Sequence, residues 1–382
     1  MKSSLGCVCL LLASISSFAA PARPDFNGDL HADIAWFKPD GSLGVWDMNG
    51  LSRIDYGALP SSPGTTMAFT GDIDGDGKSD VVARRPDGGY TIYFMDGAAG
   101  KSTYDIAANG WAIAAVADFN ADGKADLLWV DNFGNLGVWL MDGASVIDYA
   151  ALDSPYPSYN SQLLAVADFD GDGRSDLLVR YGGYVQLLLM DGLQAKTSAQ
   201  LRDNSTVAGG QWWPVLTGDF DGDGKADIVW EDNFGAYGLW LMDGTTVKST
   251  TTVLAAGGHW RAVMTADLDG DGKDDIIWHN DMDGSYGAWI MNGAAASAYG
   301  VLLYGGSSWE LVDGRDLDGD GKTDLLWHNT YDNTYGAWIM NGLAPSSYGA
   351  LLYPAPGDGS NHWTPLPVKG AFLGVTCTPS GC

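Results

Sequence analysis

The sequence predicts an all-β fold of seven repeated units, each a sheet of four antiparallel strands. A nine-residue acidic loop recurs at intervals of 46 to 51 residues, beginning at Asp25, Asp72, Asp118, Asp168, Asp219, Asp267 and Asp316. Each copy runs directly into a short apolar segment such as DLLW or DIIW, which has the composition of a strand. No segment shows a helical period. A self-similar period of about 50 residues indicates an array of units that bury their apolar faces against one another.

The elements of one unit follow in a fixed order, which the third unit shows clearly. The expected elements are a first strand at 111–117, the acidic loop at 118–126, a second strand at 127–130, a polar turn at 131–134, a third strand at 136–141 and a fourth strand at 144–150. In all seven units the third strand ends in Met followed by Asp-Gly or Asn-Gly, which favours a tight hairpin turn. Four antiparallel strands in roughly 40–50 residues is the size of one blade, so the sequence predicts a seven-bladed β-propeller.

The acidic loop has the donor pattern of a calcium site. In the loop 267–275, positions 1, 3, 5 and 9 are Asp, and glycines at positions 4 and 6 allow the chain to turn around an ion. Calcium prefers about six to eight oxygen ligands, which the carboxylates and the main-chain oxygen of position 7 can supply. An EF-hand needs a Glu at position 12 and flanking helices, whereas position 12 here is Trp278. Asp-Gly turns without metal are the other alternative, but seven such loops would hold mutually repelling carboxylates.

The sequence therefore predicts up to seven bound Ca²⁺ ions. Loops one and three should bind more weakly, because Asn27 and Asn120 occupy position 3 and Leu30 and Ala121 replace glycines. The expected ligands are positions 1, 3, 5, 7 and 9 of each loop: Asp25, Asn27, Asp29, His31, Asp33, Asp72, Asp74, Asp76, Lys78, Asp80, Asp118, Asn120, Asp122, Lys124, Asp126, Asp168, Asp170, Asp172, Arg174, Asp176, Asp219, Asp221, Asp223, Lys225, Asp227, Asp267, Asp269, Asp271, Lys273, Asp275, Asp316, Asp318, Asp320, Lys322 and Asp324.

Composition and charge narrow the class of protein. The chain has 48 Asp and Glu against 20 Lys and Arg, a formal net charge of −28, yet 46% of its residues are apolar and 12% are aromatic. Disordered acidic chains lack that apolar content, so the composition indicates a globular protein. The negative charge disfavours nucleic acid and anionic membranes as partners. No apolar stretch reaches the length that membrane insertion requires.

The two ends of the chain are expected to lie outside the repeat. Residues 1–19 hold a single charge before an apolar run and end in small residues, which is the pattern of a secretory signal peptide. The rest divides into a propeller at 20–376 and a tail at 377–382, where Cys377 and Cys382 favour a small disulfide in an oxidising compartment. We therefore expect a secreted, extracellular protein. The periplasm and the cell surface are alternatives that the sequence leaves open.

The ring is expected to close through the C-terminus. A tryptophan lies seven residues before the next loop in four units: Trp111, Trp212, Trp260 and Trp309. The first loop, at Asp25, has no such strand before it once the signal is removed. The segment 361–368 resembles 258–264, so we expect it to supply the inner strand of the first blade. Pro365 and Pro367 weaken the match because proline cannot donate to a strand ladder.

The loop D-x-D-G-D-G-x-x-D followed by a strand resembles the FG-GAP repeats of integrin α-subunit propellers and the related VCBS repeats of secreted bacterial proteins. The resemblance covers about residues 25–376. It implies a seven-bladed propeller with calcium loops joining the first and second strands on one face. Secreted proteins with similar repeats include seven-bladed lectins that bind sugars and calcium-dependent rhamnogalacturonan lyases built on a larger, eight-bladed ring. A shared fold does not by itself assign a function.

Tryptophan occurs 16 times, in three registers. Two registers lie in mid-strand, and their rings are expected to pack between blades: Trp36, Trp129, Trp230, Trp278 and Trp327, then Trp46, Trp139, Trp240, Trp289 and Trp338. The inner-strand row lies at the strand end farthest from the calcium loop, beside the connectors between blades. Aromatic rings repeated on such loops suit the flat faces of sugars, which they would bind at several weak sites. The expected ligand-binding residues are Trp111, Trp212, Trp260, His279, Trp309, His328 and Trp363. A purely structural turn role is the alternative for the two histidines.

The sequence favours a lectin-like or adhesion module over an enzyme. The expected partners are glycans or cell-surface glycoconjugates, with another extracellular protein as a second option. The HExxH, G-x-S-x-G, G-x-x-x-x-G-K-[ST] and Cys-His zinc patterns do not occur. The alternative is a calcium-dependent polysaccharide lyase or hydrolase, for which the candidate residues near a uronic sugar are Arg84, Arg85, Arg180 and Tyr181 of the atypical second and fourth units.

Overall fold

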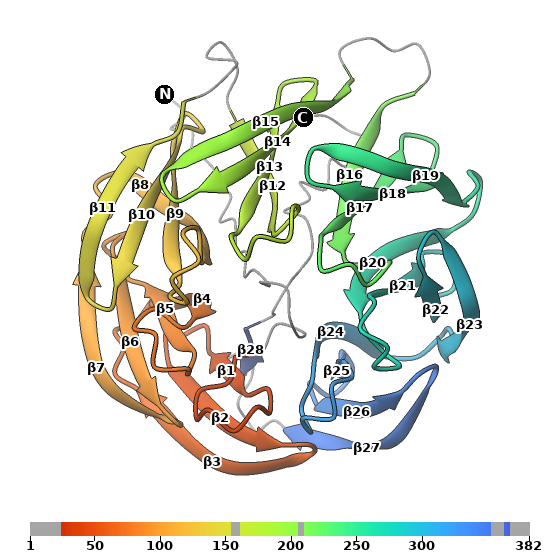
Figure 1. The fold of residues 1–382 in the computed structure, drawn as a ribbon. Coiled ribbons are helices and arrows are strands. Elements are labelled where there is room, and N and C mark those ends of the chain that lie inside the picture. Colours follow the sequence, from red (N-terminus) through yellow and green to blue (C-terminus); the bar gives the residue numbers. More distant parts are fainter. Residues whose placement is uncertain (1–23, 154–160, 205–209, 353–362, 367–382) are drawn as a thin grey trace, which may run out of the picture.

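The computed structural model describes residues 24–153, 161–204, 210–352 and 363–366, and every regular element in them is a β-strand. The strands form seven four-stranded antiparallel sheets arranged in a ring, as Figure 1 shows. The prediction of an all-β, seven-bladed β-propeller is therefore confirmed. Within these described ranges, no helix has the length and apolar character needed to cross a membrane. The predicted signal peptide at 1–19 and tail at 377–382 lie outside the described residues.

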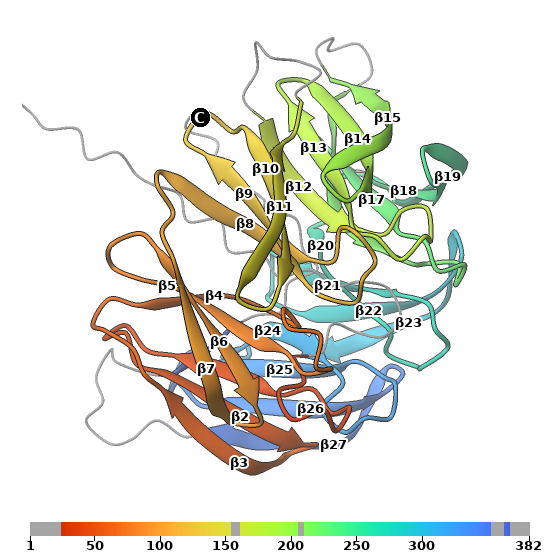
Figure 2. The same ribbon diagram turned by 60° about the vertical axis from the view of Figure 1, so that its left-hand side comes forward.

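Each blade takes its four strands from the centre of the ring to its rim, and Figure 2 shows the same blades from the side. The strands are, for blade 1, β28 (Thr364–Pro365), β1 (Ile34–Phe37), β2 (Leu43–Asn49) and β3 (Ser52–Leu59); for blade 2, β4 (Thr66–Gly71), β5 (Asp80–Arg84), β6 (Tyr90–Asp96) and β7 (Ala99–Ile106); for blade 3, β8 (Trp111–Ala117), β9 (Asp126–Asp131), β10 (Leu136–Asp142) and β11 (Ser145–Ala151); for blade 4, β12 (Ser161–Ala167), β13 (Asp176–Tyr181), β14 (Tyr184–Asp191) and β15 (Gln194–Asp203). The remaining strands are, for blade 5, β16 (Trp212–Gly218), β17 (Asp227–Asp232), β18 (Tyr237–Asp243) and β19 (Thr246–Leu254); for blade 6, β20 (Trp260–Ala266), β21 (Asp275–Asn280), β22 (Tyr286–Asn292) and β23 (Ala295–Leu303); for blade 7, β24 (Trp309–Arg315), β25 (Asp324–Asn329), β26 (Tyr335–Asn341) and β27 (Ala344–Leu352).

The apolar core is divided into seven clusters, and each cluster joins two consecutive blades. Between blades 2 and 3, for example, Phe69 and Val82 pack with Ile113 and Trp129. The seventh cluster joins blade 7 to blade 1, so the ring of apolar contacts is complete. A single blade cannot bury both faces of its sheet, and stacking against its neighbours is what stabilises it.

Both mid-strand tryptophan registers pack in these clusters, as predicted. The second-strand tryptophans are at most 3% exposed: Trp36, Trp129, Trp230, Trp278 and Trp327. Each of them lies tilted against the third-strand tryptophan of its own blade where that residue is present, with ring centroids 4.7–5.0 Å apart. A tyrosine of the preceding blade often meets the same ring edge-on, and the centroids of Tyr237 and Trp278 lie 5.0 Å apart. Edge-to-face contacts of this kind add to the stabilisation from burial alone.

The C-terminal segment closes the ring. β28 pairs with β1 through Trp36 opposite Pro365 and Phe37 opposite Thr364, and the N–H of Leu366 donates to the oxygen of Ala35 at 2.7 Å. The predicted source of the first blade's inner strand is thus confirmed. The described ladder is only two residues long, shorter than the inner strands of the other blades. Pro365 explains part of the difference, because its nitrogen has no hydrogen to donate.

A buried arginine fastens this closure. Arg315, at the end of β24, is fully buried and forms an ion pair with Asp313 of the same strand. Its guanidinium also donates to the main-chain oxygens of Asp33, at 2.5 Å, and Leu366, at 2.9 Å. One side chain therefore bonds blade 7, blade 1 and the C-terminal segment together. A buried charge is tolerated only when paired and hydrogen-bonded, and here both conditions hold.

Candidate functional site

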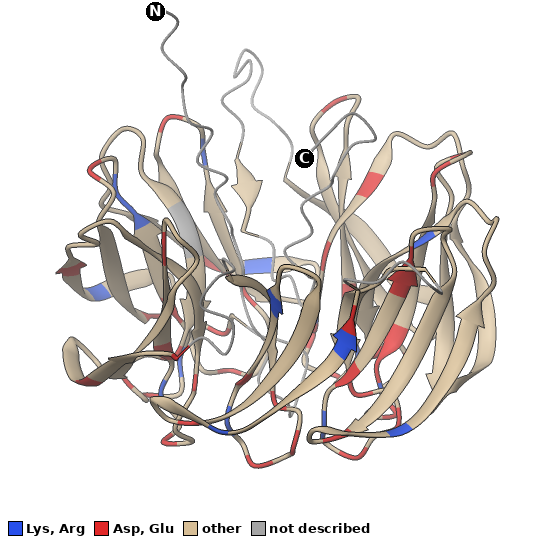
Figure 3. Cartoon of the chain, turned by 90° about the horizontal axis from the view of Figure 1, so that it is seen from above, with Lys and Arg blue, Asp and Glu red and all other residues tan. Residues whose placement is uncertain are grey.

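The acidic loops connect the inner and second strands of blades 2 to 7, and in blade 1, whose inner strand is β28, the loop precedes β1. They lie on one side of the ring, where Figure 3 shows acidic residues concentrated. The position-9 Asp begins the second strand and is buried. In blade 2, Asp80 accepts the N–H of Ile73 and the N–H of Met95, both at 2.9 Å. The same pair of bonds recurs in all seven blades. This carboxylate therefore ties each loop to the third strand of its blade.

The position-1 Asp shapes the turn of the loop. Asp72 accepts the N–H of Gly75 at 2.7 Å and that of Gly77 at 2.9 Å, and both glycines have positive φ. Leu30 and Ala121, which replace glycines in loops one and three, take the same left-handed conformation, with φ of 70° and 59°. The loop shape is kept in both, at a strain of roughly 1–2 kcal/mol per residue. The sequence departures therefore alter ligands and strain but not the path of the chain.

Neighbouring loops are joined into a continuous hydrogen-bonded belt. The N–H of Ser79 in the second loop donates to the oxygen of Asp25 in the first, at 2.6 Å, and the N–H of Gly97 donates to Phe26 at 2.7 Å. Equivalent bonds link every consecutive pair of blades, and those from Ala32 and Gly50 to the seventh loop complete the circle. An ion that orders one loop would therefore also order its contacts with the next blade.

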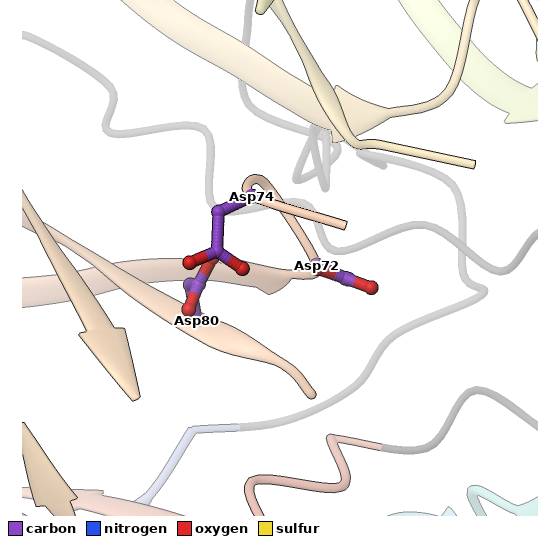
Figure 4. Close-up of side chains that lie close together, drawn as sticks. All are labelled: Asp72, Asp74 and Asp80. Atoms are coloured by element: carbon purple, nitrogen blue, oxygen red, sulfur yellow. The ribbon is translucent and has the colours of Figure 1, made fainter. Parts of the chain in front are cut away.

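The carboxylates of five loops gather closely enough to share one cation. In blades 2, 4 and 5, ligand oxygens from positions 1, 3 and 9 lie within 4.8 Å of one another, and in blades 6 and 7 those from positions 1, 3 and 5 do so. Figure 4 shows the set in blade 2, formed by Asp72, Asp74 and Asp80. In loops one and three the amides of Asn27 and Asn120 instead donate to the position-5 carboxylate at 3.1 Å.

The electrostatics of the loops fit a divalent cation. Burial raises the pKa of Asp80 to about 7 and that of Asp275 to about 8, and neighbouring loop carboxylates add to the effect. One buried carboxylate oxygen in each of Asp170 and Asp221 has no hydrogen-bond partner among the described residues. A hard cation would supply the missing partner and favour the ionised carboxylates. The donor set of Asp oxygens is the set that calcium prefers.

Three of these sites hold a lysine between their carboxylates. A β-bulge in the fourth strand directs Lys101, Lys196 and Lys248 towards the loops of blades 2, 4 and 5. The ammonium of Lys248 lies 2.6 Å from both Asp221 and Asp223. In blades 6 and 7 a serine occupies the bulge. The five sites therefore fall into two electrostatic classes, which the sequence analysis did not distinguish.

The position-7 side chain also has two arrangements. In blades 2 to 5 it pairs with the Asp of the Met-Asp-Gly hairpin, as Lys124 does with Asp142 at 2.5 Å. Blades 6 and 7 have Asn in that hairpin, and Lys273 pairs instead with Asp271 of its own loop at 2.7 Å. The expected metal ligand at position 7 is the main-chain oxygen, which does not depend on the Asp with which the side chain pairs.

The inner-strand tryptophans lie at the end of the blades opposite the loops, as predicted. All five described members of the row, from Trp111 to Trp363, are partly buried. Each ring lies over a glycine two strands away in its own blade, where an added Cβ would approach the ring at 3.4–3.7 Å: Gly44, Gly137, Gly238, Gly287 and Gly336. One side of each ring therefore packs within the blade. The sequence analysis missed these glycines, although they recur two residues before the third-strand tryptophan.

The two predicted histidines share junctions with the tryptophan of the following blade. The imidazole of His279 contacts the ring of Tyr286, with centroids 4.7 Å apart, and Tyr286 and Trp309 border the same cluster between blades 6 and 7. His328 likewise stacks on Tyr335, which borders the cluster that contains Trp363. We call such a meeting point, formed by the fifth residue of a second strand and the first tryptophan of the next blade, a blade junction.

The same junction recurs with other polar residues. Side chains alternate along a strand, so Arg84, Arg180 and Glu231 occupy the position of the histidines in blades 2, 4 and 5. The inner strands of the following blades begin at Trp111, Trp212 and Trp260, and Arg180 lies over the ring of Trp213 in blade 5. The turns next to the row also expose large apolar side chains that the sequence analysis did not select: Phe133, Phe234, Met282 and Tyr331.

The four residues proposed for the lyase alternative do not form one cluster. Arg84 and Arg85 belong to blade 2, whereas Arg180 and Tyr181 belong to blade 4, with blade 3 between them. Arg85 pairs with Asp87 at 3.2 Å and Asp105 at 2.9 Å. The expectation of a joint site is wrong because the two atypical units are not neighbours in the ring.

Comparison with known proteins identifies the repeat. A family profile described as FG-GAP-like repeat matches residues 25–83, 72–129, 118–179, 168–230 and 232–278, which together span more than half of the chain. No curated protein matches the sequence. A solved structure of an Agrocybe aegerita lectin that specifically recognises non-reducing terminal N-acetylglucosamine has a TM-score of 0.60 at 18% identity, over 84% of this chain and 90% of that chain. Raptor of Chaetomium thermophilum has a TM-score of 0.51 at 12% identity, over 91% of this chain and 30% of that chain. At these identities the likeness concerns the fold.

Proposed function

Because the chain belongs to the FG-GAP-like repeat family, we propose that it is a secreted, calcium-binding propeller that binds carbohydrate at its blade junctions. The observation that carries the proposal is the repetition of one pattern around one face: five partly exposed inner-strand tryptophans, each following a blade whose second strand has a polar residue at its fifth position. Repeated weak sites suit a polymer or a cell surface, because avidity multiplies their effect. Such a module has no need of a catalytic centre, and we propose none.

Calcium in this proposal is structural. The loop carboxylates would hold it together with the main-chain oxygen of position 7, and its charge would relieve their mutual repulsion. Because the loops are hydrogen-bonded to one another around the ring, bound ions would stiffen the whole side of the molecule. The sugar-binding side would then keep its blades, and hence its junctions, in fixed register.

The chemistry of the junctions supports carbohydrate over other ligands. Indole rings offer a flat apolar face to a sugar ring, and the adjoining imidazole, guanidinium or carboxylate can bond its hydroxyl groups. The lectin of the same fold makes N-acetylglucosamine a sensible first probe. A second candidate partner is an extracellular protein, which the exposed Phe133, Phe234, Met282 and Tyr331 on the neighbouring turns favour.

A glycan array tests the proposal. The purified protein, labelled and loaded with calcium, should bind a discrete set of glycans, and binding should fall when chelator loosens the loops. A variant with Trp260→Ala and Trp309→Ala should lose most of the signal. Absence of binding to every glycan, at a protein concentration where avidity would reveal millimolar sites, would contradict the proposal.

A further inference from the structure

Cationic side chains in this acidic protein are mostly neutralised by aspartate. Ion pairs fix the lysines of the loops, Arg174, Arg261 and the buried Arg315, among others. No carboxylate of the described residues lies within ion-pair distance of the guanidinium of Arg180 or Arg202 in blade 4. Arg53 and Arg84 also have no such ion pair, but only Arg180 and Arg202 lie together in one blade. Both side chains are partly buried. Two partly desolvated positive charges without counter-ions are unexpected in a chain of net charge −28.

The two arginines lie in one cross-strand row and meet two tryptophans of the next blade. Arg180 of β13 and Arg202 of β15 both pair with Val185 of β14, so they are two strands apart, or about 10 Å. The guanidinium of Arg180 lies 3.9 Å from the ring centre of Trp213, and that of Arg202 lies 5.9 Å from that of Trp212. Both distances lie within the range of a cation–π contact, which positions a guanidinium over an indole ring without using its N–H groups.

A buried amide fixes this arrangement. Asn204 is 2% exposed and accepts the N–H of Trp212 at 3.1 Å. The side-chain amide of Asn204 donates to the main-chain oxygen of Trp212 at 2.7 Å. The Nε of Arg202 donates to the side-chain oxygen of Asn204 at 3.3 Å. The Nε of Arg180 donates to the oxygen of Gly182 at 2.7 Å. In both arginines the terminal nitrogens, which form the fork that binds anions, have no hydrogen-bond partner among the residues that the structure describes, and the hydrogen bonds of Nε organise the site before any ligand arrives.

The guanidiniums of Arg180 and Arg202 have the electrostatic character of an anion-binding site. Burial alone lowers the pKa of Arg180 and of Arg202, whereas Asp87 raises that of Arg85 in blade 2. Both guanidiniums nevertheless remain charged at every physiological pH. A carboxylate is the ligand group whose planar geometry best matches a guanidinium fork.

We propose that the junction between blades 4 and 5 binds the carboxylate of an acidic sugar, with Arg180 and Arg202 as the anion-binding groups and Trp212 and Trp213 as the rings that position them. The inference rests on the proposed carbohydrate binding and names the substrate class for this junction. A dense polyanion such as nucleic acid would be repelled by the net charge of −28, whereas one carboxylate per sugar ring is a smaller penalty. The histidine junctions at blades 6 and 7 have no comparable unpaired charge, so they suit neutral sugars.

Three matched trisaccharides separate this proposal from the function on which it rests. The probes are trigalacturonic acid, its methyl ester and the trimer of N-acetylglucosamine, titrated calorimetrically into calcium-loaded protein at low and at physiological salt. We expect the acid to bind at least tenfold more tightly than its ester, with the difference shrinking as salt screens the charge. Equal binding of acid and ester would overturn the inference while leaving the proposed function intact. Failure of all three probes to bind would instead count against the proposed function.

Variants locate the effect. Arg180→Gln with Arg202→Gln should remove the preference for the acid over the ester and leave the neutral trimer unchanged. Arg53→Gln is the matched control, because Arg53 also stacks on aromatic rings, Trp46 at 4.7 Å and Tyr56 at 4.6 Å, but lies on the outer strand of blade 1. An equal loss in this control would overturn the site, since only net charge would then matter. If the double variant melts early, Arg180→Lys provides the second test: it keeps the charge but loses the fork, and it should lower acid binding severalfold.

Discussion

Removing the lysines that lie between the loop carboxylates should strengthen calcium binding. Lys248 places its ammonium 2.6 Å from both Asp221 and Asp223, whose oxygens an incoming ion would need. Burial disfavours this ammonium, but the hydrogen bonds to the two carboxylates outweigh burial and raise the pKa of Lys248. Calcium must therefore displace a charged group. Each such partly exposed ion pair is worth roughly 0.2–1 kcal/mol, so two pairs oppose calcium by about 0.4–2 kcal/mol. That range corresponds to a change in dissociation constant of roughly 2- to 30-fold.

The assay compares two triple variants of equal charge. In the first, Lys101→Met, Lys196→Met and Lys248→Met remove the competing ammoniums from blades 2, 4 and 5. In the control, Lys78→Met, Lys124→Met and Lys225→Met remove lysines that pair with the hairpin Asp residues and leave the fourth-strand lysines in place. Calorimetric titration of metal-free protein with calcium should show tighter binding in the first variant only.

The melting temperature provides a second test, because the shift caused by the first variant should have opposite signs without and with calcium. Without calcium the first variant should melt earlier than the parent, because its loop carboxylates have lost the ammonium groups that pair with them, and with calcium it should melt later. If the control tightens binding as much as the first variant does, net charge explains the effect and the competition is refuted.

The remaining predictions concern stability. At free calcium near 100 times the dissociation constant each filled loop should add about 2.7 kcal/mol, so excess EGTA should lower the melting temperature by tens of degrees, and an unchanged melting curve would refute structural calcium. Arg315→Met should cost roughly 3–5 kcal/mol in urea unfolding by removing the counter-ion of the buried Asp313, and adding Asp313→Leu should recover most of the loss. A chain ending at residue 361 lacks β28 and should aggregate, whereas one ending at 376 should melt like the full chain; a monomeric short chain with native melting would contradict the closure.

Much of the fold could be predicted because one pattern is repeated seven times. The hairpin dipeptides, the loop spacing and the strand composition all act locally, and the four strands of blade 3 end within about a residue of their predicted bounds. Ring closure was also predictable, since a missing inner strand at one end of the chain had a counterpart at the other. The length of that closing strand could not be predicted, because Pro365 interrupts the ladder and the side chain of Arg315 bonds the oxygen of Leu366.

The site was less predictable because its parts come from different blades. The loop ligands follow from spacing within nine residues, but the fourth-strand lysine reaches the loop only through a bulge, about 25 residues away in sequence. Tyr286, which contacts His279, shares an apolar cluster with Trp309 of the following blade, and no local pattern indicates that packing. The glycine under each inner-strand tryptophan recurs at a fixed place before the third-strand tryptophan, so the sequence does contain a signal for it. That signal can be interpreted only once the geometry of the sheet is known.

The tryptophans of the blade junctions are the centre of the proposed binding surface. Trp309→Ala tests it when sugar binding per folded molecule and the free energy of unfolding are measured on the same sample. Trp278→Ala is the reference, since that ring is 2% exposed and its loss should cost roughly 3–5 kcal/mol. Trp309→Ala should weaken glycan binding severalfold at a smaller cost in stability. A stability loss as large as that of Trp278→Ala, with unchanged sugar binding by the folded fraction, would show that the row is core and not surface.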